Sequence, residues 1–259
     1  MDSLTVKYNS DLLKSTGLIQ ETIVLIETYE PGMSVDELYS IAVESNILSK
    51  ASNSRIKDII KHAFYRRYVI GNEKIAENLK FLRTKFIGND TFLQLLLVYT
   101  CRANTILGDF IKTVYYDVIN KGYQVIDTTD PQKFISEAVK DGRIEKPWAD
   151  STKKKVSEHI IATLIDFKLI DKVKKILPFH ITDLTVNYLI HELHFKGYSD
   201  DQIVYANDWP LFGLHKEDVL NTMERLSFQG HFIYQHSGEL LKIAWKYKTM
   251  KESIDGITR

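Results

Sequence analysis

The stretch YANDWPLFGLHKEDV, residues 205–219, decides how the C-terminal part of the chain folds. It places Trp209, Pro210, Phe212 and Gly213 in one short connection between two polar segments with helical character. We expect Pro210 to end the preceding helical conformation and Gly213 to permit a left-handed backbone. Trp209 and Phe212 are then predicted to pack beneath the turn. The alternative is a ligand pocket built from the same aromatic side chains.

The segments around this stretch follow the order helix, helix, helix, hairpin. The final part changes its hydrophobic period, because HFIYQH and ELLKIAWKY alternate like strands and flank the dipeptide Ser237-Gly238. Two such runs joined by a two-residue turn are typical of a β-hairpin. The sequence therefore predicts a winged-helix-like unit over residues 179–247, with a short tail at 248–259.

The N-terminal part is also predicted to be helical. Ser34 precedes an apolar run and Glu37 follows three residues later, which is the pattern of a capping box. Three helices with polar turns predict a helix-turn-helix-like unit over residues 17–70, after a flexible arm at 1–16. The fold class is mostly α.

Two segments connect these units. Residues 71–140 are predicted to form a central helical core, with long helices at about 73–86 and 90–121 and a break near 104–108. Residues 141–178 are predicted to hold a basic helix and, at about 170–177, a short strand or wing.

The composition is that of an ordinary globular protein. The 259 residues are 44% hydrophobic and 26% charged, with a formal net charge of zero and a single cysteine. One cysteine excludes an internal disulfide and fits a reducing cytoplasm, which is the expected location. The most apolar run, residues 92–101, is far shorter than the ~20 residues that cross a bilayer, so no membrane association is expected.

The sequence contains no pattern that predicts catalysis. The HELH segment sets His191 and His194 three residues apart, whereas the HExxH zinc motif needs histidines four apart. Cys101 lies in an apolar helix, where an inert core role is expected. We find no glycine-rich phosphate loop, nucleophile elbow or paired carboxylates. The prediction is a protein without enzymatic activity, metal or cofactor.

A first basic region runs from Lys50 to Arg67, with six basic residues against one acid, a net charge of +5. At about 100° per residue, Lys57 and Lys61 lie beside the apolar face, with Asp58 and Tyr65 opposite it. Arg55, His62 and Arg66 complete the exposed arc. Arg67 falls on the apolar side, so we expect it beyond the last packed turn or reaching out to solvent. The residues predicted to contact DNA here are Ser52, Asn53, Ser54, Arg55, Lys57, Lys61, Arg66 and Arg67, with the first three meeting phosphate at the helix start. An ordinary solvated helix face is the alternative.

A second basic region runs from Ser151 to Lys175, with seven lysines against three acids. Lysines at the start of a helix oppose its dipole, and a bound phosphate would relieve that cost. The residues predicted to contact DNA are Lys153, Lys154, Lys155, Lys174 and Lys175; simple solvation is again the alternative.

By contrast, residues 179–245 have four basic residues and nine acids, a net charge of −5. They are expected to serve protein binding or structure rather than DNA contact, because phosphate contacts dominate DNA affinity.

Three segments together resemble the BrxA family of bacterial BREX phage-defence systems. They are NDWPLFGLHKEDV (207–219), PWADSTKKKVSEHIIATLIDFKLID (147–171) and the run from Gly17 to Arg67, and the resemblance covers about residues 17–245. It implies a small, mostly helical cytoplasmic protein without established enzymatic activity. It also implies binding of double-stranded DNA, and other BREX proteins as partners. A protein-interaction scaffold and an RNA-binding protein are the alternatives.

Overall fold

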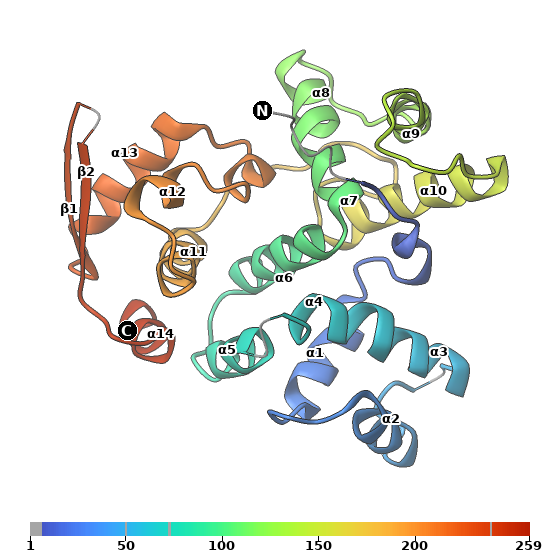
Figure 1. Ribbon diagram of the computed structural model, residues 1–259, viewed down its shortest axis with the longest axis horizontal. Coiled ribbons are helices and arrows are strands. Elements are labelled where there is room, and N and C mark those ends of the chain that lie inside the picture. The colour runs from blue at the N-terminus through green and yellow to red at the C-terminus, as the bar shows by residue number, and fades with distance from the viewer. Residues whose placement is uncertain (1–6, 50, 72–73, 239) are drawn as a thin grey trace. The chain divides into compact units, whose positions relative to one another are not determined.

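The computed structural model describes residues 7–49, 51–71, 74–238 and 240–259 (Figure 1). It is mostly helical with a small antiparallel sheet near the C-terminus, which confirms the predicted fold class. The chain forms two compact units, each from two segments. Unit 1 combines Met1–Glu77 with Leu96–Phe179, and unit 2 combines Asn78–Leu95 with His180–Arg259.

Unit 1 contains the helices of the N-terminal and middle parts of the chain. In chain order these are η1 (Asp11–Lys14), α1 (Ile19–Thr28), α2 (Val35–Glu44), α3 (Asn53–Asp58), η2 (Ile59–Tyr65), α4 (Arg66–Tyr68), α7 (Thr105–Phe110), η3 (Ile111–Tyr115), α8 (Tyr116–Asn120), α9 (Thr129–Lys140) and α10 (Asp150–Asp166). Two further helices, α5 (Lys74–Arg83) and α6 (Asn89–Ala103), each divide between the units. The predicted break near residue 104 is confirmed, because Asn104 is not helical and separates α6 from α7.

A chain of buried aromatic rings holds the N-terminal helices to α6. The ring centroids of Tyr29 and Phe64 are 5.6 Å apart, those of Phe64 and Tyr68 5.8 Å, and those of Tyr68 and Tyr99 6.1 Å. All four residues are at most 1% exposed. Aromatic pairs at such distances stabilise a core beyond the area they bury. The capping box of Ser34 and Glu37 is confirmed at the start of α2.

The helix from Asn53 to Tyr68 changes its winding part of the way along. Residues Ile59–Tyr65 are π-helical, and this segment continues α3 into α4. A π-helix has more residues per turn than an α-helix, so positions after residue 59 turn away from the angles expected for 3.6 residues. The predicted exposure of Tyr65 is wrong, because its side chain is 7% exposed and its hydroxyl donates to the Met33 carbonyl.

The described part of the predicted flexible arm is packed against the unit. Residues 11–14 form a 3₁₀ helix, Leu12 is fully buried, and the Tyr8 hydroxyl donates to Asp109 over 2.8 Å. The first six residues of the arm lie outside the described residues.

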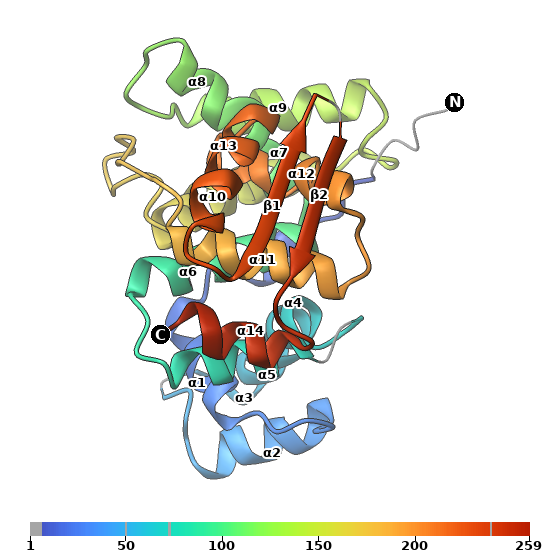
Figure 2. The ribbon, with the colours of Figure 1, turned by 90° about the vertical axis from the view of Figure 1, so that its left-hand side faces the viewer.

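Unit 2 follows the order helix, helix, helix, hairpin, and ends in one more helix (Figure 2). Its elements are α11 (Asp183–Phe195), α12 (Asp200–Val204), η4 (Trp209–Phe212), α13 (Lys216–Ser227), β1 (Phe232–Ser237), β2 (Leu240–Trp245) and α14 (Met250–Ile257). The predicted tail is therefore mostly helix α14, and its Ile254 is fully buried.

The hairpin has a different register from the expected one. Ser237 pairs with Leu240 and Phe232 with Trp245, so the strands are connected by residues 238 and 239 rather than by Ser237 and Gly238. The partner of each β1 residue moves by two positions, so the same side chains still face the core. The expected strand or wing at 170–177 is reduced to isolated bridges, Ile170 with Ile176 and Val125 with Lys175.

The connection that contains Trp209 has the predicted structural role. Trp209 is 1% and Phe212 6% exposed, and Gly213 has φ +69°, in the left-handed region. The Trp209 indole N–H donates to the Ile203 carbonyl over 2.6 Å. The ring thus fills the core beneath the turn and ties it to the end of α12.

Replacement of Trp209 by alanine is expected to lower the free energy of unfolding of unit 2 by roughly 3–5 kcal/mol, because a large buried ring and its hydrogen bond are lost. Urea unfolding followed by far-UV circular dichroism measures the change. Phe228→Ala is the control, since Phe228 is 84% exposed. Equal stability of the two variants would contradict a buried role for Trp209.

Candidate nucleic-acid interface

A buried arginine anchors the segment that leads into the first helix. The Arg67 side chain is 3% exposed, and its guanidinium donates to the carbonyls of Ser15, Thr16 and Gly17 at 3.2, 2.7 and 3.1 Å. It also donates to the Ser15 hydroxyl over 2.9 Å. The expectation that Arg67 reaches solvent or contacts DNA is therefore wrong. Arg67 lies on the apolar side of the helix, as the spacing placed it, but backbone carbonyls bind its charge there and it does not reach solvent.

Asp166, at the end of α10, holds the same segment from the other side. Its Oδ2 accepts from the Gly17 amide over 2.8 Å. A Cβ on residue 17 would lie 2.5 Å from the Asp166 Cβ, so this close approach requires glycine. Arg67 and Asp166 thus bind the same short segment, residues 15–17: Arg67 binds its carbonyls and Asp166 binds the Gly17 amide.

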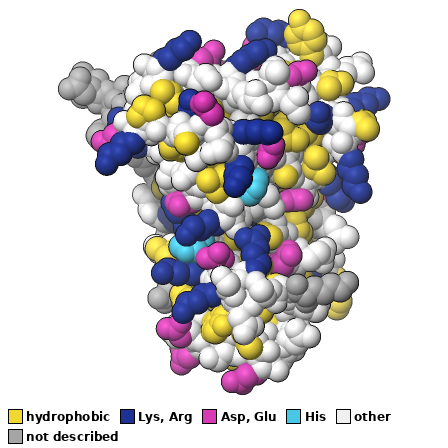
Figure 3. Space-filling model, turned by 90° about the vertical axis from the view of Figure 1, so that its right-hand side faces the viewer, with side chains coloured by type: hydrophobic (Ala, Val, Ile, Leu, Met, Phe, Trp, Pro, Cys, Tyr) yellow, Lys and Arg dark blue, Asp and Glu magenta, His cyan; other side chains and the backbone are white. Residues whose placement is uncertain are grey.

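This anchoring places η1 beside both predicted basic helices. The Arg55 guanidinium donates to the Lys14 carbonyl over 2.6 Å, and the Lys14 ammonium lies 3.2 Å from the His62 Nε2. On the other side, the His159 Nδ1 of α10 lies 2.9 Å from the Leu12 carbonyl. Two regions about a hundred residues apart in sequence therefore meet across η1 in unit 1. Figure 3 shows the face that carries these elements, where Lys and Arg side chains gather with acidic side chains between them.

The residues predicted on the first helix lie where a nucleic acid could reach most of them. Ser52 is the N-cap of α3 and its hydroxyl accepts from the Arg55 amide, while Asn53 and Ser54 in the first turn are exposed. Lys61 is exposed and has no ion pair among the described residues.

The other cations of this helix are partly engaged. Lys57 lies 3.6 Å from Asp36, with both side chains exposed, so the pair is weak. Arg66 forms an ion pair with Asp11, and Arg55 is half-buried against η1. Lys61 is therefore the freest cation of the predicted set on this helix.

The five lysines predicted in the second basic region lie in two different places, on α10 and in a later turn. Lys154 and Lys155 are exposed on the second turn of α10 and are free of ion pairs in the described part of the chain. Lys153 lies 3.0 Å from Asp150, the first helical residue, and this acid offsets the cost expected from lysines near the helix dipole. Lys174 and Lys175 lie in a turn that pairs with residues 124–126. This turn follows the end of α10, whereas Lys153, Lys154 and Lys155 lie near its start.

The predicted contacts lack three residues of this surface. Lys14 lay in the presumed arm, and His159 carries no signal without the fold. His62 was expected on the exposed arc of the first basic helix but not among the contacts. Burial, and then the nearby Lys14, lower the pKa of His62 below its ordinary value of 6.5. Its ring is neutral at neutral pH and adds positive charge only in acid.

The histidine pair of the HELH segment is part of a core. His191 is fully buried, its Nδ1 donates to the Asn187 carbonyl over 2.7 Å, and its ring lies 5.1 Å from that of Trp245. His194 stacks on the same indole at 4.3 Å. In the described ranges no three His, Cys, Asp or Glu residues are placed to hold a metal ion. Nor does any described helix have the length and apolar character needed to cross a bilayer.

Comparison with known proteins identifies the family. A crystal structure of an uncharacterized protein from Magnetospirillum magneticum is similar, with a TM-score of 0.55 and 18% identity over 73% of this chain and 95% of that chain, which shows a shared fold. No curated protein matches the sequence. The family model of BrxA matches residues 6–192. The chain therefore belongs to the BrxA family, as the sequence resemblance predicted, and is a component of a BREX phage-defence system.

Replacement of Arg67 by alanine is expected to cost roughly 3–5 kcal/mol of unfolding free energy, because three carbonyls in the interior lose a charged donor. Lys61→Ala, on the same helix but exposed, should change stability by less than about 0.5 kcal/mol. Chemical denaturation compares the two. An Arg67 variant as stable as the Lys61 variant would show that the anchor contributes little.

Burial lowers the pKa of His191 to about 4, from 6.5 in the unfolded chain. The unfolded state then binds a proton more readily, so the stability of unit 2 should be complete above pH 6.5 and fall as the pH drops from 6.5 to 4, by up to about 3 kcal/mol. His191→Leu should flatten this part of the stability–pH curve, whereas His180→Gln, at an exposed position, should leave it unchanged. A His191→Leu curve as steep as that of the parent would assign the acid sensitivity to other groups.

Proposed function

We propose that this protein is a non-enzymatic double-stranded DNA-binding component of its BREX system, and that unit 1 carries the binding surface. The observation that supports this most is the meeting of two basic helices across η1. Lys61 from η2, Lys14 from η1, and Lys154 and Lys155 from α10 present cations on one unit. Each of these four side chains is exposed.

The chemistry of the surface favours contact with the phosphate backbone. Lysine is a flexible point charge that suits phosphate without dictating a base sequence. None of the three arginines of the first basic helix is free to make a bidentate contact with a base edge. Arg55 binds the Lys14 carbonyl, Arg66 pairs with Asp11, and Arg67 is buried. We therefore propose binding with little sequence preference and a strong dependence on salt.

The test is the joint replacement of Lys61, Lys154 and Lys155 by alanine in the full chain. Each phosphate contact contributes about 0.9 to the slope of log affinity against log salt, so the variant should bind duplex DNA more weakly and lose up to about 2.7 from that slope. A mobility shift at several salt concentrations measures both quantities.

The matched control replaces three exposed lysines of unit 2, Lys242, Lys248 and Lys251. This variant removes the same charge and should leave the affinity and the slope nearly unchanged. If the control variant loses affinity and the unit 1 variant does not, the DNA surface lies in unit 2. A parent protein that binds single-stranded RNA more tightly than duplex DNA would replace the proposed ligand.

A further inference from the structure

The outer edge of strand β1 has unsatisfied backbone groups. In an antiparallel pair, residues alternate between those that bond to the partner strand and those that face away. The pair Ser237–Leu240 closes a two-residue turn, so residues 233, 235 and 237 bond to β2 while Tyr234 and His236 face outward. The Ile243 amide, opposite Tyr234, bonds to the Asp200 side chain instead of to β1, which supports the same alternation. No other described group bonds to the backbone of Tyr234 or His236.

The two edges of the hairpin differ in how they are protected. Asp200 caps the outer edge of β2 over 3.0 Å. The β1 sequence, FIYQHS, contains no lysine or proline, the residues that natural proteins place on edges to prevent further pairing. An open edge of this kind is the site at which an extended peptide adds a strand.

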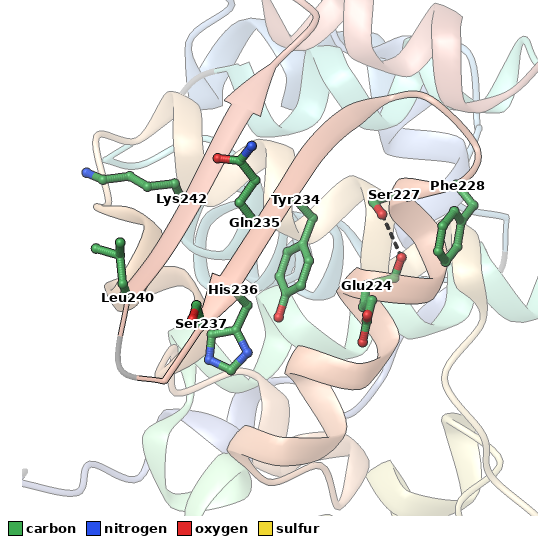
Figure 4. Close-up of a pocket in the computed structure, with 9 residues that line it drawn as sticks. All are labelled: Glu224, Ser227, Phe228, Tyr234, Gln235, His236, Ser237, Leu240 and Lys242. Atoms are coloured by element: carbon green, nitrogen blue, oxygen red, sulfur yellow. Dashed lines mark hydrogen bonds between the residues drawn. The ribbon is translucent and has the colours of Figure 1, made fainter.

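A groove runs along this open edge. It has a volume of ≈ 540 Å³, and Glu224, Ser227 and Phe228 at the end of α13 form its other wall. Figure 4 shows Tyr234 projecting from β1 toward Glu224, with His236 on the same side of the strand. The space beside the open backbone groups is thus bounded by a helix that can contact the side chains of an added strand.

The side chains around the groove indicate which kind of strand it accepts. Glu224 lines the groove, and Glu217, seven residues earlier on the same helix and outside the groove, is exposed as well. The two cations of that helix are engaged, since Arg225 binds Asp183 through two bonds of 2.6 Å and Lys216 lies over the Tyr205 ring. Lys242 also lines the groove, but it comes from β2 and points away from Glu224 (Figure 4). On the opposite face of the hairpin, Ile233 is 64% exposed.

We propose that the outer edge of β1 binds an extended segment of another polypeptide in which apolar and basic residues alternate. The backbone of that segment would pair with Tyr234 and His236. Its basic side chains would face Glu224, and its apolar side chains would lie beside Ile233, because successive side chains of a strand point to opposite faces. This inference is independent of DNA binding by unit 1.

Two other occupants fit the charges less well. A second copy of this chain would bring its own β1, which has no lysine or arginine, and would set one Glu224 near another. Duplex DNA would place phosphates against Glu217 and Glu224. The experiment below distinguishes both from a peptide.

The test uses the full chain and fluorescently labelled octapeptides of alternating valine and lysine, or alternating valine and glutamate. Fluorescence anisotropy should show binding of the lysine peptide, and hydrogen exchange followed by NMR should show slower exchange at the amides of Tyr234 and His236. His236→Pro removes one outward N–H and leaves the bonds to β2 intact, so it should abolish binding. Gln235→Ala, whose backbone faces β2, is the matched control and should bind like the parent.

Glu224→Lys changes one exposed side chain and tests the charge without touching the strand. It should weaken the lysine peptide and strengthen the glutamate peptide, each by about three- to tenfold. No binding of the lysine peptide, or binding unaffected by both His236→Pro and Glu224→Lys, would overturn the proposal. Slower exchange at Tyr234 and His236 caused by duplex DNA, or by raising the protein concentration alone, would overturn it in favour of DNA or a second copy.

Discussion

The arrangement of unit 1 depends on the buried guanidinium of Arg67. A charge in a protein interior is costly unless hydrogen bonds replace its hydration, and here three consecutive carbonyls and a hydroxyl do so. Asp166 binds the amide of the same segment, at a glycine that allows close approach. The segment before α1 is therefore held through both its backbone carbonyls and a backbone amide. This fixes η1 between the two helices that carry the basic residues.

Local signals in the sequence predicted much of the fold. The capping box at Ser34, the alternation of the hairpin and the turn at Gly213 are each set by neighbouring residues, and the structure confirms all three. Trp209 could be predicted as buried because a large ring beside a proline and a glycine in a short turn has few other places to pack.

The errors arose where distant residues decide the conformation. The π-helical segment Ile59–Tyr65 changes the angle between successive side chains, so a count at 100° per residue misplaced Tyr65. The same count put Arg67 on the apolar side, where it lies, and only its expected reach to solvent was wrong. Distant residues hold both side chains, because the Tyr65 hydroxyl donates to the Met33 carbonyl and Arg67 donates to residues 15–17. The part of the surface contributed by Lys14 could not be predicted either, because nothing local to that segment shows that it packs between two helices.

Charge is distributed differently in the two units. Unit 1 presents exposed lysines from three elements that meet at η1, whereas residues 180–245 of unit 2 have a net charge of −5. The hairpin of unit 2 adds an unprotected strand edge beside exposed acids. Two units with the same predicted class of helical motif thus offer surfaces for opposite charges. The helical order alone does not define the ligand of either unit.

Lysine footprinting by acetylation, with and without duplex DNA and read residue by residue by mass spectrometry, tests whether unit 1 carries the DNA surface. If the proposed surface across η1 binds DNA, Lys14, Lys61, Lys154 and Lys155 are protected together, and Lys242 stays as reactive as in the free protein. Protection of Lys242 with unchanged reactivity of the other four would contradict that proposal.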